Sequence, residues 1–134
     1  MGGVSKMSYE EAELLKERAE HFLENAKELI EKGVYDLAAF NLEQYCQLIL
    51  KYLLLIETST YPRTHSLTRL LEILSSIKPG LKILLDDENH YLVITKLEDA
   101  YIGARYLPRR YTEKEVKAMY RFVVEVFKRV VEGV

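Results

Sequence analysis

The segment from Asp36 to about Glu57 most constrains how this chain can fold. At ~100° per residue, the angle of an α-helix, apolar side chains cover most of its circumference. A helix of this kind is either the central helix of a bundle or half of a dimer seam, and we favour both. Thr58 to Pro62 then form a loop, because the residue before a proline avoids the helical conformation.

A narrow polar strip interrupts this apolar helix. It consists of Glu43, Gln44, Gln47 and Lys51, with Asn41 to one side. Because polar groups on a largely buried helix need hydrogen-bond partners, these side chains either satisfy one another or cross a subunit interface. Cys46 lies in the same helix, and a single cysteine makes neither an internal disulfide nor a metal cage. We expect it to be buried and reduced.

Four further segments have apolar residues at helical steps of three and four. The first begins at Ser8, with Glu11 completing a capping box, and ends at Gly33. The second of these is short, is capped by Thr64 or Ser66, and stops at Lys78 to Gly80. A brief turn over Leu81–Leu85 and an acidic stretch then lead to the remaining two.

One of these runs through Leu92, Leu97 and Ala104 and is bounded by Pro108. The last opens with Thr112 and Glu115, a second capping box. No segment predicts a strand. The chain of 134 residues is therefore expected to be one all-α domain, an antiparallel four- to five-helix up-and-down bundle, with residues 1–7 flexible.

Charge and hydropathy restrict the possible partners. Met1 to Met7 hold no apolar stretch, so we expect no signal peptide, and Leu48 to Ile56 is too short to span a bilayer. We expect a cytoplasmic protein without a membrane partner. The net charge is −2, but residues 102–134 carry 8 basic and 4 acidic side chains, which places any affinity for phosphate toward the C-terminus. The domain as a whole is too acidic to coat nucleic acid in general, because domains that do so typically have a pI above ~9.

The turn before the last predicted helix is the first candidate site. Arginines grip phosphate and stack on bases, tyrosines offer a ring and a hydroxyl, and a helix N-terminus favours anions. The residues concerned are Tyr101, Arg105, Tyr106, Arg109, Arg110 and Tyr111. We expect nucleotide or partner binding here. In the alternative, Arg105 complements the dipole at the end of the preceding helix and the tyrosines cover the core.

Arg63 and His65 form the second candidate site. A histidine beside an arginine could act on a phosphodiester as general acid or base, but it could also pack at the helix entry and bond to backbone. The other histidines, His21 and His90, have no partner at helical spacing, so the sequence predicts no metal site. No cofactor motif and no catalytic set are present.

Several stretches together resemble the HEPN family of helical-bundle domains. They are Ala26-Lys27 and Leu29, the run Gly33–Phe40, Glu43-Gln44 leading to Leu50-Lys51, Thr64–Leu67 with Leu70-Leu71, and Ala104–Tyr106 before a proline and a final helix. The resemblance covers residues 8 to 131. It implies a homodimer with a nucleotide or RNA role, often beside a minimal nucleotidyltransferase partner in a two-component or toxin–antitoxin system.

Many members of this family are ribonucleases that use an arginine, four to six intervening residues and a histidine. Here Arg105 is followed after five residues by Tyr111, and no histidine lies beyond His90. Tyrosine, with a pKa near ~10, is a poor base at neutral pH. The sequence is therefore similar to a non-nucleolytic member. The alternative is a metal-independent ribonuclease dimer with an atypical site that uses Arg63, His65 or Arg105.

Overall fold

The computed structural model describes residues 6–134, with side chains from Tyr9 onward, and this part of the chain is helical without any strand. The elements are α1 (Lys6–Glu31), α2 (Tyr35–Thr58), α3 (Leu67–Ile77), a 3₁₀ turn (Pro79–Lys82), α4 (Ile83–Asp86), α5 (Glu88–Gly103), α6 (Glu113–Phe122), a π-helical turn (Val123–Phe127) and α7 (Lys128–Glu132). The predicted all-α bundle is confirmed.

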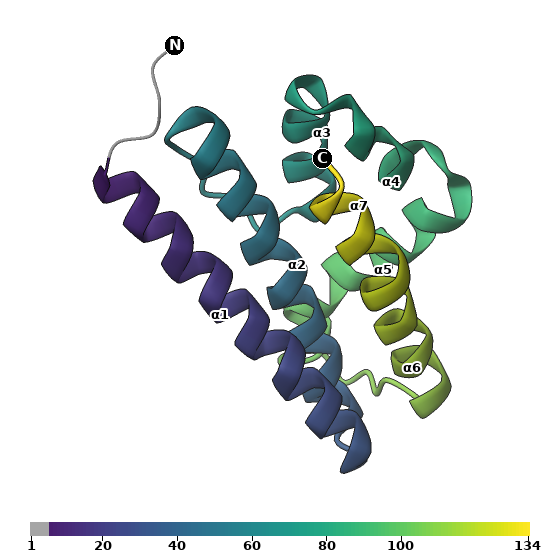
Figure 1. Ribbon diagram of the computed structural model, residues 1–134. Helices are drawn as coiled ribbons and strands as arrows, with labels where there is room; N and C mark the ends of the chain where they lie inside the picture. Colours follow the sequence, from purple (N-terminus) through teal and green to yellow (C-terminus); the bar gives the residue numbers. More distant parts are fainter. Residues whose placement is uncertain (1–5) are drawn as a thin grey trace.

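The long helix α2 occupies the centre of the molecule. It forms an antiparallel hairpin with α1 and also packs against α3, α5 and α6 (Figure 1). Its side chains are buried around most of the circumference, among them Leu42, Cys46, Leu50 and Leu54. The apolar pattern of residues 36–57 thus reflects a central helix, as predicted, and the buried Cys46 thiol is free.

A tight turn at Gly33 joins α1 to α2. Gly33 adopts a φ of +76°, a left-handed conformation that costs little only without a Cβ atom. The Gly33 amide donates to the Ile30 carbonyl at 3.1 Å and the Val34 amide to that of Leu29 at 2.8 Å. This pair of bonds is the Schellman motif, which satisfies the last carbonyls of a helix.

The predicted start of the first helix is wrong by two residues. The helix already includes Lys6 and Met7, so Ser8 lies within it and is not its N-cap. Neither residue breaks a helix, and the chain continues the turn instead of capping it at Ser8. The expected flexibility concerns residues 1–7, of which 1–5 lie outside the described part.

The two other predicted caps are confirmed. The Ser66 hydroxyl accepts from the Arg69 amide, and Thr112 and Glu115 bond reciprocally to each other's amides in a capping box. From Thr112 the chain continues through α6, the π turn and α7 without a break. The wider π turn keeps Val123, Phe127 and Val131, each four residues apart, in the core.

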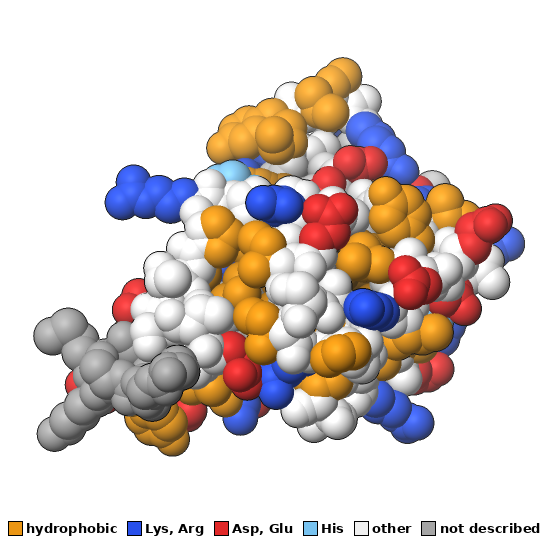
Figure 2. Space-filling view, turned by 90° about the horizontal axis from the view of Figure 1, so that it is seen from above, with side chains coloured by type: hydrophobic (Ala, Val, Ile, Leu, Met, Phe, Trp, Pro, Cys, Tyr) orange, Lys and Arg blue, Asp and Glu red, His pale blue; other side chains and the backbone are white. Residues whose placement is uncertain are grey.

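The surface offers no single large apolar face in the view of Figure 2, where apolar patches alternate with charged side chains. Within residues 6–134, no helix has the length and hydropathy needed to cross a membrane. The elements that matter for a site are therefore α2, the entry to α3, and the end of α5 with the loop that follows it.

Candidate functional site

The polar strip of α2 lies inside the bundle, where its members satisfy one another. Glu43 is fully buried, and its two carboxyl oxygens accept from Gln44 Nε2 and Gln47 Nε2, each at 2.7 Å. Lys51 Nζ donates to Gln47 Oε1 at 3.1 Å. Of the two interpretations of the strip, mutual satisfaction fits these contacts, because Glu43, Gln47 and Lys51 are buried by this chain's own elements.

Burial raises the pKa of Glu43 from 4.5 to about 7. The hydrogen bonds from Gln44 and Gln47 and the charges of Arg105 and Lys51 act in the opposite direction, but they do not outweigh the loss of water. Glu43 is therefore an acid that is partly protonated at neutral pH, at the inner end of a polar network.

His65 extends this network to the surface. Its Nδ1 lies 3.4 Å from Gln47 Oε1, and its Nε2 lies 3.2 Å from the Tyr101 hydroxyl. Because the Lys51 ammonium can only donate, Gln47 turns its oxygen toward Lys51 and His65. The His65 Nδ1 must then carry the proton, and Nε2 accepts from Tyr101. We call Glu43, Gln47, His65 and Tyr101 the hydrogen-bonded chain.

The Tyr101 ring also stacks on the His65 ring, with centroids 4.2 Å apart and planes 17° apart. The structure thus brings together three sets of residues that the sequence presented separately: the α2 strip, the entry to α3, and the end of α5.

Arg105 lies against three aromatic rings at the end of α5. Its guanidinium carbon is 4.5 Å from the Phe40 ring centroid, 4.6 Å from that of Tyr101 and 4.7 Å from that of Tyr106. Its Nε donates to the Tyr101 carbonyl at 2.9 Å, so Arg105 does cap the last turn of α5. We call these four residues the Arg105 cluster. Among the described residues, no hydrogen bond occupies its two terminal nitrogens, and the side chain is exposed.

Arg109 is held differently. Its Nη2 lies 2.6 Å from Glu115 Oε2, an oxygen that Lys96 also approaches at 2.9 Å, and its guanidinium covers the Tyr111 ring at 3.9 Å. The Lys96 hydrogen bond is the main cause that lowers the pKa of Glu115 to about 2, and Arg109 adds to it. Arg109 therefore fastens the loop to α6, whereas Arg63 and Arg110 are exposed.

Tyr111 belongs to the core, as the alternative interpretation of the tyrosines has it. It is 5 % exposed, and its amide donates to Asp36 Oδ1 at 2.8 Å. A Cβ atom on Gly103 would lie 3.1 Å from the Tyr111 hydroxyl, so the glycine makes room for it. Burial raises the pKa of Tyr111. Tyr106, in contrast, is 70 % exposed.

An open groove of about 890 Å³ begins where the hydrogen-bonded chain reaches the surface. His65 and Tyr101 line it at the α3 side, and Lys96 and Arg109 line it at the α6 side. Its other walls are mainly apolar side chains of α5 and the following loop, namely Leu92, Ile102 and Leu107. Tyr101 belongs to both the groove and the Arg105 cluster and so connects them.

Sequence reasoning missed two contributors. Phe40 joins the Arg105 cluster although it precedes Arg105 by 65 positions, and no local pattern indicates such a contact. The sequence pattern indicates Glu115 only as part of a helix cap, yet its carboxylate also pairs with Lys96 and Arg109. The density of basic residues near Glu115 was the only available signal.

Comparison with known proteins gives one result. A family model described as the HEPN domain matches residues 12–134, which is nearly the whole chain. No curated protein matches the chain.

Proposed function

The chain belongs to the HEPN domain family, and from that premise we propose that it is a non-nucleolytic module that binds nucleotide or RNA phosphate at the Arg105 cluster. In this proposal it acts as a homodimer together with a minimal nucleotidyltransferase, in a two-component system of the toxin–antitoxin kind.

The observation that carries the proposal is the state of Arg105. Rings of Phe40, Tyr101 and Tyr106 surround its guanidinium, and the Tyr101 carbonyl fixes its Nε. A pre-oriented guanidinium with its outer N–H groups toward solvent is suited to a two-pronged grip on a phosphate. The neighbouring groove has apolar walls against which a base or ribose could pack.

The position of Tyr111 supports a non-nucleolytic role. Six positions after Arg105, where family ribonucleases have a histidine, this chain has a buried tyrosine whose pKa is raised further by burial. A phenol in that state does not accept a proton at neutral pH. The place of the usual base is thus taken by a residue that packs the loop against the core.

The first test compares Arg105→Ala with the wild-type chain in calorimetric titrations with a ribonucleoside triphosphate and a short single-stranded RNA. Loss of a charge-assisted contact should weaken binding by about tenfold or more, and Arg105→Lys, which keeps the charge but not the fork, should fall in between. Arg18→Ala is the matched control, because Arg18 is exposed on α1 and α2 separates α1 from α5. Equal affinities in the wild type and Arg105→Ala would refute the site.

The partner is tested by purification of the tagged protein from its native cells. A small nucleotidyltransferase recovered in comparable amount, and lost from Arg105→Ala, would place that partner at the same surface. Recovery of the chain alone, without such a protein, would remove the two-component part of the proposal and leave the binding of nucleotide or RNA as its content.

A second candidate function, ribonuclease activity, is favoured by His65 alone. Its Nδ1 is fixed by Gln47, and its Nε2 points to the Tyr101 hydroxyl. His65 and Tyr101 both line the surface groove, an arrangement that general acid–base chemistry can use. Labelled single-stranded RNA incubated with the wild type and with His65→Ala separates the two functions. Cleavage that depends on His65 would favour the ribonuclease, and its absence leaves the binding module.

A further inference from the structure

A second groove, of about 700 Å³, lies on another side of the molecule, between α1 and the C-terminal rod of α6 and α7 (Figure 1). Its floor is one face of α2, and its walls are one face of α1 and the side chains of α7. None of its lining residues belongs to the hydrogen-bonded chain or the Arg105 cluster. The apolar floor consists of Tyr45, Ile49, Tyr52, Leu53 and Ile56.

The residues that line this groove follow the spacing of helical faces. The α1 residues that line it, from Lys16 to Lys27, recur every three or four positions, and so do the α2 residues from Tyr45 to Glu57. Eleven steps from Lys16 to Lys27 correspond to about 17 Å, or three helical turns. Tyr52, Leu53 and Ile56 on the floor are only half-buried. A helical wall beside an apolar floor of this length is a geometry that accepts an amphipathic helix.

Tyr45 supplies a polar group at the bottom of the groove. It is 2 % exposed, and its ring packs edge-on against that of Phe127, with the two centroids 6.0 Å apart. Burial is the main cause that raises its pKa, and the carboxylates of Glu132 and Glu20 contribute. The two carboxylates beside Tyr45 make this part of the groove a place for a cation from outside.

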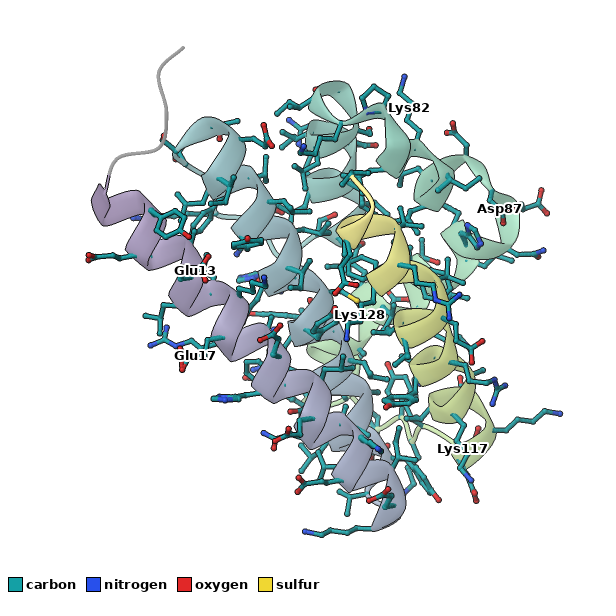
Figure 3. The ribbon with its side chains drawn as sticks, in the orientation of Figure 1. Glu13, Glu17, Lys82, Asp87, Lys117 and Lys128 are labelled. Carbon is teal, nitrogen blue, oxygen red and sulfur yellow. The ribbon has the colours of Figure 1, made fainter. Side chains whose placement is uncertain are left out.

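The charges along the rims have a defined order. On α1 the sequence of charges is Lys16, Glu20, Glu24, Lys27, which is basic at both ends and acidic in the middle, and on α7 Lys128 is followed by Glu132. In the described part of the chain, none of these six groups takes part in an ion pair. Figure 3 shows Lys128 on α7, on the side of α2.

We propose that this groove binds an amphipathic helix of a partner protein. Its apolar stripe lies on the α2 floor, and the edge that faces α1 carries lysine or arginine at two central positions and glutamate or aspartate at the two ends. A central ammonium then pairs with the carboxylates of Glu20 and Glu132, which flank Tyr45. This docking surface is separate from the Arg105 cluster. A variant that loses helix binding should therefore still bind nucleotide, and a variant that loses nucleotide binding should still bind the helix.

The test uses two labelled helical peptides of about four turns with identical apolar residues. The matched peptide carries Glu, Lys, Lys, Glu at intervals of three to four residues, and the reversed peptide carries Lys, Glu, Glu, Lys. Fluorescence anisotropy should show that the wild-type chain binds the matched peptide about tenfold or more tightly than the reversed one.

The variant Glu20→Lys with Glu24→Lys, at two exposed positions, should abolish this preference, because the α1 rim is then basic throughout and meets two opposite and two like charges in either peptide. Glu17→Lys with Glu28→Lys is the control: it makes the same change of charge at exposed α1 positions that do not line the groove, and should keep the wild-type preference. If the wild type binds neither peptide or binds both with equal affinity, or if the Glu20/Glu24 variant keeps the wild-type preference, the proposal is overturned.

Discussion

At the scale of single residues, the fully buried carboxyl of Glu43 is the least expected feature. A carboxyl out of water is costly when charged, and here only two amides and two more distant cations offset that cost. Glu43 and Lys51 hold the Gln47 side chain, which in turn orients His65. The orientation of a surface histidine is thus decided by an acid in the core.

The raised pKa of Glu43 predicts a characteristic dependence of stability on pH. Between pH 4.5, the ordinary value, and about 7, the folded chain binds more protons at this position than the unfolded chain does. The free energy of unfolding therefore falls as the pH rises through this window, by up to about 3 kcal/mol from this group, and is constant above it.

Glu43→Gln removes this contribution. Urea unfolding at a series of pH values should show that the wild type loses stability between pH 4.5 and about 7 relative to the variant. The comparison concerns the slope, since glutamine leaves one neighbouring amide without its acceptor and lowers stability at every pH. Parallel curves for the two proteins would mean that Glu43 titrates as it does in water.

At the scale of elements, α5 fixes the start of α3. Glu98 Oε1 accepts from Ser66 Oγ at 2.9 Å, from the Thr68 amide at 2.9 Å and from Thr68 Oγ1 at 3.1 Å. One carboxylate on α5 thus joins the capping residue of α3 to an amide of its first turn. The same contact sets the position of His65, which immediately precedes the cap.

Loss of this carboxylate should destabilise the fold. Glu98→Ala leaves the Thr68 amide without its partner, which costs about 1–3 kcal/mol in the free energy of unfolding. Glu72→Ala serves as comparison, because the Glu72–Arg69 pair spans 3.8 Å on an exposed surface and contributes less than about 0.5 kcal/mol. Chemical denaturation measures the free energy of unfolding of both variants. If Glu98→Ala loses no more stability than Glu72→Ala, the contact of Glu98 with the start of α3 is dispensable for stability.

Element types could be predicted from the sequence, because apolar spacing and caps are local signals. Ser66 and Thr112 each combine a hydroxyl with a following apolar stripe, and both are caps in the structure. Ser8 has the same signature, but the preceding residues also favour a helix and extend it. The site was less predictable: its residues could be named one by one, but the contact of His65 with Gln47 and Tyr101 depends on tertiary packing.

For the molecule as a whole, a homodimer is now expected from the surface of α5 and not from that of α2. The apolar circumference of α2 is covered by the chain's own helices. A group of exposed apolar side chains lies instead on α5 and the loop after it: Leu92, Ile102, Tyr106 and Leu107, each more than half exposed. We propose that a second copy covers this face.

Light scattering at micromolar concentration should then give the mass of a dimer for the wild type. Ile102→Glu with Leu107→Glu should give the monomer mass of 15.7 kDa, because two buried carboxylates oppose association. Leu14→Glu with Leu37→Glu, at exposed apolar positions on α1 and α2, should remain dimeric. A monomeric wild type would remove the homodimer from the proposed function.

The hydrogen-bonded chain also has a consequence for how the protein is made. Its members come from positions 43–47, 65 and 101, whereas the α1–α2 hairpin is complete once residue 58 has left the ribosome. In a half-synthesised chain that consists of this hairpin, Glu43 faces water and is ionised at neutral pH. Docking of α3 and α5 then removes the carboxylate from water, and the rise in its pKa to about 7 favours the uptake of a proton. The Arg105 cluster, the proposed anion site, is likewise complete only once Tyr106 has been translated, in the last quarter of the chain.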